Sequence, residues 1–117
     1  MQFSFATRVD YNDDFKARFH REARDRLVKL ATMIPLEPGS FDLRNNRGGV
    51  AVSGEITLHA EAIYIQVSQS CVGVGMGVLV RTCQGRADFT GGQNNWWPLS
   101  SLDDLPTLAA KIRKVMA

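Results

Sequence analysis

The spacing of apolar residues changes twice along this chain, and this change limits the fold more than any other feature of the sequence. Near the N-terminus, apolar residues recur every three or four positions, the interval that gathers side chains on one face of an α-helix. The positions are Phe15, Phe19, Ala23, Leu27, Leu30 and Ala31. With Asn12 as an N-cap and Pro35 as a terminator, the pattern predicts a helix over roughly 12–33.

The middle of the chain alternates apolar and polar residues, which is the period of a strand with one buried face. Two strands are predicted, over 50–58 and 63–68. With 59–62 as a four-residue connection, Leu58 faces Ile63 and Ile56 faces Ile65. Further strands are predicted over about 78–84 and, from weaker patterns, over 41–45 and 3–7.

A second helical stripe ends the chain, and Asp103 or Asp104 caps it with Pro106 in its first turn. Its positions are Leu105, Leu108, Ala109, Ile112, Val115 and Met116. Two one-sided helices and a sheet with one apolar face bury one another as a two-layer α+β sandwich. We therefore predict one domain over 1–117, with two helices on one face of an antiparallel sheet of three or four strands. The order is α-β-β-β-α, with 3–7 as a candidate extra N-terminal strand, and the other sheet face is left to solvent or a partner.

Composition limits the class of protein. At 117 residues and 44% hydrophobic content, the chain is long enough for one core. No apolar run approaches the roughly 20 residues of a membrane span. The first residues lack the basic start and apolar core of a signal peptide, which predicts a cytoplasmic protein. Cys71 and Cys83 are accordingly expected to be free thiols.

Both tryptophans lie in a segment of glycine, amide and charged residues, 84–98, where the sequence predicts an irregular loop. If the chain is extended there, Trp96 and Trp97 point to opposite sides, so that one fills the core and the other stays near the surface. In the alternative, both cap the core. An exposed tryptophan beside polar side chains suits a protein hot spot or a stacking platform for a base. The predicted partner-binding residues are Arg81, Arg86, Asp88, Asn94, Asn95, Trp96 and Trp97.

Two further surfaces are candidates for binding a partner. The polar face of the strands supplies sheet-face contacts, namely Arg44, Glu55, Tyr64 and Gln66. The first helix carries six basic and two acidic residues within 16–29. Its candidate nucleic-acid contacts are Arg18, Arg21, Arg24 and Lys29. The alternative is a solvated helix face with ion pairs at four-residue spacing, Arg18/Glu22, Arg21/Asp25 and Asp25/Lys29.

The sequence predicts no catalytic residue, no metal site and no cofactor. Cys83, His59 and Glu55 are the one set that could supply a nucleophile, a base and an orienting group, but nothing brings Cys83 to the other two. His59, next to a hairpin turn, is expected to be exposed. The two histidines and two cysteines lack metal-ligand spacing, and the glycine-rich runs lack the phosphate-loop and dinucleotide patterns.

Two resemblances accompany these patterns. The order helix, three antiparallel strands, helix resembles double-stranded RNA-binding domains, whose second helix begins with lysines that contact phosphates. Here residues 102–105 are Leu, Asp, Asp and Leu, a departure that argues against the same binding mode. The segments FDLRNNRGG, IYIQVSQS and RTCQGRADFTGGQNNW, within 41–96, resemble small uncharacterised proteins of phages and prophages. That resemblance implies an accessory or host-directed binding role.

We therefore expect a small non-enzymatic interaction protein of the cytoplasm that binds a protein partner stoichiometrically, as a phage or prophage accessory protein or as an inhibitor of a host system. In this mechanism Trp96 or Trp97 anchors in a partner pocket, while Arg81, Arg86 and Asp88 set the orientation. The alternative is a nucleic-acid-binding module that uses the basic helix and the tryptophan loop. A formal net charge of only +2 counts against the alternative.

Overall fold

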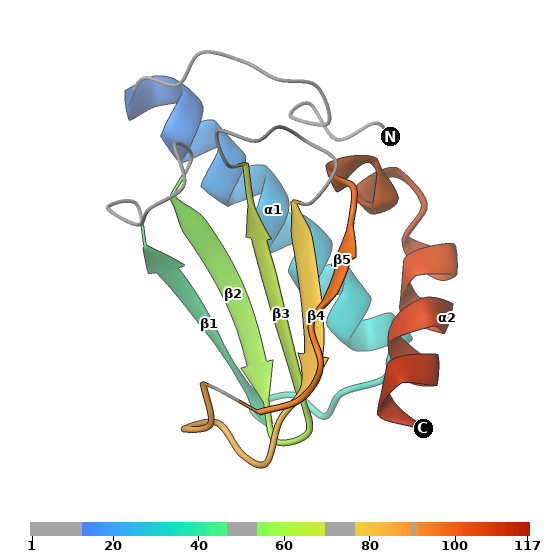
Figure 1. The fold of residues 1–117 in the computed structure, drawn as a ribbon. Coiled ribbons are helices and arrows are strands. Elements are labelled where there is room, and N and C mark those ends of the chain that lie inside the picture. Colours follow the sequence, from blue (N-terminus) through green and yellow to red (C-terminus); the bar gives the residue numbers. More distant parts are fainter. Residues whose placement is uncertain (1–12, 47–53, 70–76, 90) are drawn as a thin grey trace.

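A computed structural model describes residues 13–46, 54–69, 77–89 and 91–117, and shows an α+β fold with two helices and an open antiparallel sheet of five strands (Figure 1). The elements are α1 (Asp13–Met33), β1 (Phe41–Asn46), β2 (Glu55–Ala60), β3 (Ile63–Ser68), β4 (Val78–Thr82), β5 (Asn95–Trp97), the 3-10 helix η1 (Leu99–Asp103) and α2 (Leu105–Met116). The sheet order is β1-β2-β3-β4-β5, so every strand lies beside its neighbour in sequence. The predicted fold class is confirmed, with more strands than the sequence indicated.

Both helices pack against the same face of the sheet. Apolar side chains from both helices and from the sheet form one core cluster, which includes Phe19 and Leu27 of α1, Ile65 of β3 and Ile112 of α2. Each of these four residues has no exposed side-chain surface. The apolar faces of the two helices and of the sheet therefore bury one another, as the predicted two-layer arrangement requires.

Both ends of α2 carry the capping and charged residues that the sequence predicted for them. The carboxylate of Asp104 accepts a hydrogen bond from the Thr107 backbone N–H at 3.3 Å, and Pro106 lies in the first turn. Arg113 and Lys114 lie in the last turn, where a positive charge complements the helix dipole. Of the two aspartates proposed from sequence, Asp104 is the cap.

The register of the β2–β3 hairpin corrects the prediction by two residues. A two-residue connection, Glu61-Ala62, joins the strands in place of the expected four, and Leu58 pairs with Ile65. A shift of two residues leaves every side chain on the face that was predicted for it, because strand side chains alternate with a period of two. The shorter turn adds cross-strand pairs, among them His59 with Tyr64.

The sheet also contains a strand that the sequence did not indicate. Residues 95–97, expected to be irregular, form β5 by pairing Trp97 with Val78 and Trp96 with Leu79 of β4. A stretch of three residues between Asn94 and Pro98 is too short to show a period, and the pairing depends on the free edge of β4. The candidate strand 3–7 and the predicted residues 50–53 lie outside the described residues.

Within the described part of the chain, no helix is long and apolar enough to cross a bilayer. Cys83 is a buried free thiol whose Sγ donates to the Ala60 carbonyl oxygen at 3.3 Å. Cys71 lies outside the described residues.

Candidate functional site

The sheet face turned away from the helices, called the outer face below, gathers the polar strand residues in rows. The rows across the strands are Asp42, His59, Tyr64 and Arg81; then Arg44, Thr57, Gln66, Leu79 and Trp96; then Asn46, Glu55 and Ser68. Arg44, Glu55, Tyr64 and Gln66, predicted as sheet-face contacts, thus share this face. They come together because strand residues two apart face the same way and the ladder aligns them.

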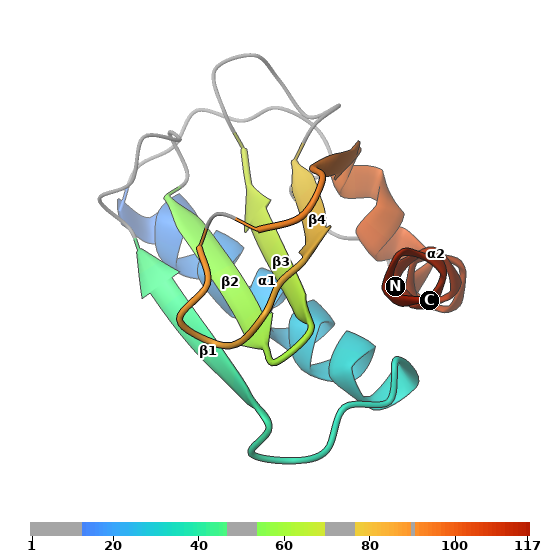
Figure 2. The same ribbon diagram turned by 60° about the horizontal axis from the view of Figure 1, so that its bottom comes forward.

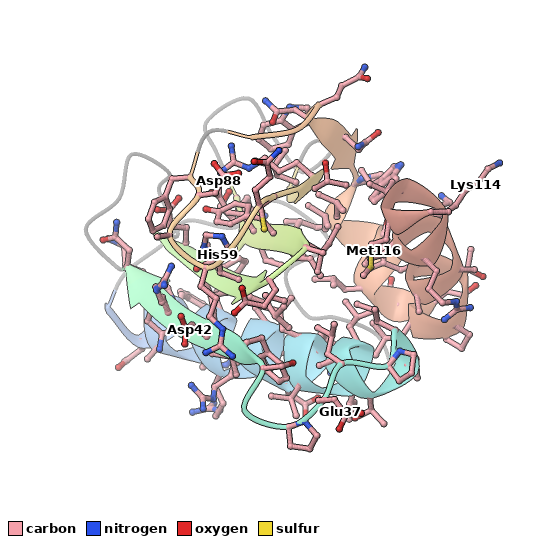
Figure 3. All side chains as sticks on the ribbon, turned by 90° about the horizontal axis from the view of Figure 1, so that it is seen from below. Glu37, Asp42, His59, Asp88, Lys114 and Met116 are labelled. Atoms are coloured by element: carbon pink, nitrogen blue, oxygen red, sulfur yellow. The ribbon has the colours of Figure 1, made fainter. Side chains whose placement is uncertain are left out.

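The outer face is not simply open, as the sequence analysis supposed. Residues 83–89 and 91–94, called the covering loop, leave the end of β4 and fold across the strands before the chain returns as β5 (Figure 2). Viewed from below, the part of this loop around Asp88 lies on the opposite side of the sheet from α1, with His59 between them (Figure 3).

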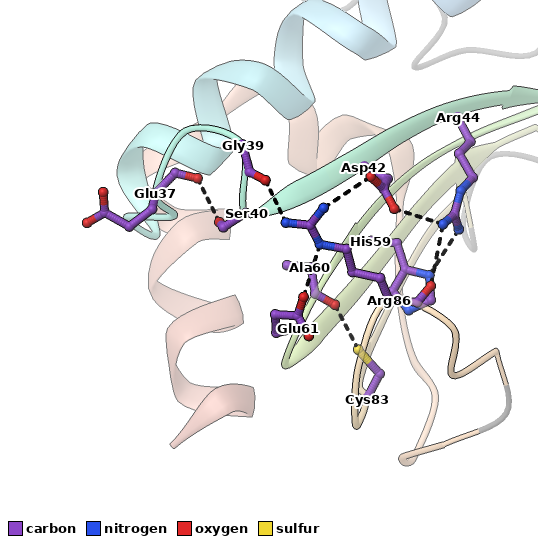
Figure 4. A network of polar contacts seen from close by, with 10 residues as sticks. All are labelled: Glu37, Gly39, Ser40, Asp42, Arg44, His59, Ala60, Glu61, Cys83 and Arg86. Carbon is purple, nitrogen blue, oxygen red and sulfur yellow. Dashed lines mark hydrogen bonds and ion pairs between the residues drawn. The ribbon is translucent and has the colours of Figure 1, made fainter.

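Arg86 attaches the covering loop to the sheet. Its guanidinium contacts Asp42 of β1 at 3.3 Å and Glu61 of the β2–β3 turn at 3.1 Å, and it donates to the Gly39 carbonyl oxygen at 2.6 Å (Figure 4). Three attachment points from one side chain fix the loop to two separate segments of the chain. Charge-assisted contacts of this kind are stronger than neutral hydrogen bonds.

Other bonds hold the loop in shape. Asp88 accepts hydrogen bonds from the backbone N–H groups of Gln84 and Gly91, both at 2.9 Å. Arg81 donates to the Phe89 carbonyl oxygen at 2.5 Å. Arg81, Arg86 and Asp88 were expected to orient a partner, but their bonds within the protein favour a role in holding the covering loop.

His59 lies fully buried beneath the loop, so the prediction that it is exposed was wrong. Its ring meets Tyr64 and Phe89 edge to face, with ring centroids 5.0 and 5.1 Å away. The Arg44 guanidinium donates to Nδ1 at 3.2 Å, so the proton of the neutral ring is assigned to Nε2, which has no partner of good geometry within the described residues.

Burial is the main cause that lowers the pKa of His59, and the positive charge of Arg44 adds to it. The backbone of Gly85 favours the protonated ring, but burial and the neighbouring guanidiniums outweigh it. His59 is therefore a neutral packing residue under the loop. Its thiol neighbour in the catalytic hypothesis, Cys83, is bonded to a backbone carbonyl instead.

A cavity of about 290 Å³ opens beside the covering loop. It is lined by Arg44, Asn45, Asn46, Glu55, Thr57, Tyr64 and Phe89. Phe89 is 54% exposed, although its backbone carbonyl and its ring both contact the sheet side chains below. Phe89 was not among the predicted site residues; its one signal in the sequence was a single large apolar residue within a polar loop.

Of the two charged side chains that line this cavity, Arg44 has an ion-pair partner and Glu55 has none within the described residues. Arg44 is bonded to Asp42 at 2.9 Å. Glu55 accepts one long hydrogen bond of 3.4 Å, from Asn46, and no cation pairs with it within the described ranges. Burial, and then the nearby Glu55 carboxylate, raise the pKa of the Tyr64 phenol. The cavity therefore combines an unneutralised carboxylate with the rings of Tyr64 and Phe89.

The two tryptophans take opposite sides, as one of the two sequence interpretations proposed. Trp97 packs against the core, with the Lys111 ammonium 5.7 Å from its ring. Trp96 pairs with Leu79 on the outer face and is 39% exposed. Of the neighbouring amides, Asn94 is exposed, while Asn95 donates to the Val80 carbonyl oxygen at 3.2 Å and so stabilises β5.

The basic residues of α1 lie away from the outer face. Arg18, Arg21, Arg24 and Lys29 are exposed, and of the predicted ion pairs Asp25–Lys29 is present at 3.0 Å. A second cavity, of about 300 Å³, lies between α1 and β1. It is lined by Ala17, His20, Arg21, Arg24 and Asn45.

The described residues contain no group of three or more histidine, cysteine, aspartate or glutamate side chains placed to hold a metal ion. The arrangement on the outer face is a fixed apolar ring beside a polar cavity, which suits binding. No protein-family model, curated protein or solved structure matches the chain.

Proposed function

We propose that this protein is a non-enzymatic binding module that recognises another protein through its outer face, with Phe89 and Trp96 as apolar anchors. The observation that carries the proposal is that the Phe89 side chain is exposed on a loop whose backbone and side chains are bonded to the sheet through Arg81 and Arg86. An apolar ring that stays exposed while its backbone is held in place is ready to enter a partner's pocket with little loss of conformational freedom.

The cavity beside Phe89 indicates what the partner presents. A carboxylate without a cation partner attracts a positively charged side chain by ion pairing. The rings of Tyr64 and Phe89 beside it already contact the guanidiniums of Arg81 and Arg44, at 4.3 and 5.3 Å, so they add apolar contact area for the stem of that side chain. We infer that a lysine or arginine of the partner enters this cavity and pairs with Glu55. A cavity of about 290 Å³ suits a single side chain.

The biological role follows the phage and prophage resemblance. We infer a cytoplasmic accessory protein that occupies a surface of a host protein and blocks it stoichiometrically. Of the two tryptophans expected as anchors, we retain Trp96, because Trp97 is packed against the core.

The test uses partners isolated with the wild-type chain as bait, followed by calorimetric titration of each purified candidate. We expect Phe89→Ala and Trp96→Ala each to weaken binding tenfold or more, since anchor residues dominate interface energies. Val28→Ala is the matched control, because Val28 is 45% exposed on α1, away from the outer face. Affinities of both anchor variants within twofold of wild type, with the fold intact by circular dichroism, would refute the proposal.

Nucleic-acid binding through α1 is the second candidate. One observation favours it: within the described residues no carboxylate pairs with Arg21 or Arg24. Contacts to two to four phosphates would give a slope of log affinity against log salt of about −2 to −4. Titration of mixed-sequence RNA and DNA at two salt concentrations would reveal that slope, and a silent titration would exclude this candidate.

A further inference from the structure

The two cavities lie on either side of the same end of β1. Asn45 lines both of them, the one at Arg21 and Arg24 on the helix side and the one at Phe89 on the outer side. β1 is the edge of the sheet, and Arg44, Asn45 and Asn46 at its end are exposed. Two cavities therefore flank one exposed strand edge: the helix-side cavity is lined by two arginines, and the outer cavity by Arg44 and the carboxylate of Glu55.

The edge of β1 carries charged residues that often prevent strand pairing, but here they are held over the outer face. Arg44 is bonded to Asp42 and to His59, and Asp42 is also bonded to Arg86 (Figure 4). No described strand pairs with β1 on the side away from β2. Every second residue of an edge strand directs its backbone N–H and C=O groups outward, where an added strand can bond to them.

The helix-side cavity is rich in hydrogen-bond donors. Arg21 and Arg24 bring two guanidiniums without carboxylate partners in the described part of the chain. The Oδ1 atom of Asn45 accepts from His20 Nδ1 at 3.0 Å, which leaves the amide nitrogen of Asn45 as a donor. Two guanidiniums and an amide N–H group match the oxygens of a carboxylate.

We propose that an extended acidic peptide segment of the protein partner adds to the sheet as a sixth strand beside β1 and places an Asp or Glu side chain in the helix-side cavity. A residue directly opposite Asn45 in such a strand has its Cβ about 4.5–5.5 Å from that of Asn45. Its side chain therefore lies beside the Asn45 amide and the two arginines. The residues before and after it face the outer cavity, where Glu55 favours a basic side chain.

This inference rests on the proposed function in taking a protein as the partner, and it adds the binding mode and the charge of the bound segment. Backbone bonds to β1 supply the affinity, as in other complexes formed by strand addition, and the two cavities select alternate side chains. Nucleic acid is the competing occupant of the arginine cavity, because phosphate uses the same donors.

The test is a selection of linear 12-residue peptides from a random display library against the whole protein, followed by titration of the selected peptides. We expect the selected sequences to share an Asp or Glu. Arg21→Gln/Arg24→Gln should weaken their binding tenfold or more, and Arg21→Lys/Arg24→Lys should recover part of the loss. The charge-matched control, Lys111→Gln/Lys114→Gln on α2, should stay within twofold of wild type, because both lysines are exposed and lie outside the two cavities. The bound peptide should slow hydrogen exchange at alternate amides of β1.

Selected peptides without a shared acidic residue, undiminished binding to the Arg21→Gln/Arg24→Gln variant, or unchanged exchange at β1 would overturn the inference. A library that yields no binder would also overturn it, as would arginine-dependent binding of mixed-sequence oligonucleotides alone. Phe89→Ala separates the two proposals: if it leaves both peptide and partner binding unchanged, the outer-face anchor fails while the β1 edge stands.

Discussion

Replacing Gly92 with alanine tests whether the covering loop returns to the sheet through a backbone contact that admits no side chain. Gly92 has a φ of 79°, and a Cβ atom placed there would lie 2.7 Å from Thr82 Oγ1, 3.0 Å from its backbone nitrogen and closer still to its carbonyl oxygen. Gly39 is a matched control, because its φ is 80° and a Cβ atom there would meet nothing within 4 Å.

The comparison separates two costs. Both substitutions place alanine in the left-handed region, which costs roughly 1–2 kcal/mol. Only Gly92→Ala adds a clash with a strand backbone, and overpacking of this kind costs about 1–3 kcal/mol. We therefore expect Gly39→Ala to lower the free energy of unfolding by about 1–2 kcal/mol and Gly92→Ala by about 2–5 kcal/mol.

Urea unfolding followed by tryptophan fluorescence measures both variants, and it reports directly on β5, which contains Trp96 and Trp97. The midpoint should move further for Gly92→Ala, while the dependence on denaturant stays equal if the unfolding remains two-state. Losses that agree within about 0.5 kcal/mol, well below the expected clash, would show that the close approach of Gly92 to Thr82 does not hold the loop.

Three further predictions concern the same region. Trp97→Ala should lower the free energy of unfolding by about 2–4 kcal/mol because it opens the core, whereas Trp96→Ala should lower it by under about 1 kcal/mol. Equal losses in urea unfolding would contradict the placement of Trp97 against the core and Trp96 on the outer face. Since burial lowers the pKa of His59, the unfolded chain binds its proton first, so His59 destabilises the fold as the pH falls below about 6.5, by at most about 1.4 kcal/mol per pH unit. His59→Gln should flatten the loss of stability between pH 7 and 5.5, and unchanged steepness would count against the burial. A double-mutant cycle of Arg86→Ala and Asp42→Ala should give a coupling of about 0.5–1 kcal/mol that shrinks at high salt, and zero coupling would remove this contact from the attachment of the loop.

Much of the fold was predictable because local sequence and tertiary packing agree there. The helix over 12–33 matches α1, because a one-sided apolar stripe has few ways to be buried. The faces of β2 and β3 were predicted correctly despite the wrong register, since a shift of two residues leaves the side-chain alternation intact. The polar sheet face could be foreseen for the same reason.

The candidate site was only partly predictable. Arg44, Glu55 and Tyr64 were found from alternation, but nothing local brings Phe89 onto the same face. Arg81, Arg86 and Asp88 were chosen as surface charges, and their partners within the protein lie on segments far apart in the sequence or along the loop itself. Such partners depend on the path of the covering loop.

The sequence by itself determined the class of fold, the two helices and the side to which each strand residue points, because these depend on spacing within a few residues. Tertiary structure alone decided the two-residue hairpin, the pairing of β5 with β4, and the burial of His59 under a loop that leaves β4, two strands away in the sheet. These features depend on contacts between distant segments, whose geometry no local period encodes. The cavities at the two sides of β1 arise in the same way, from α1, β1 and the covering loop meeting around one strand.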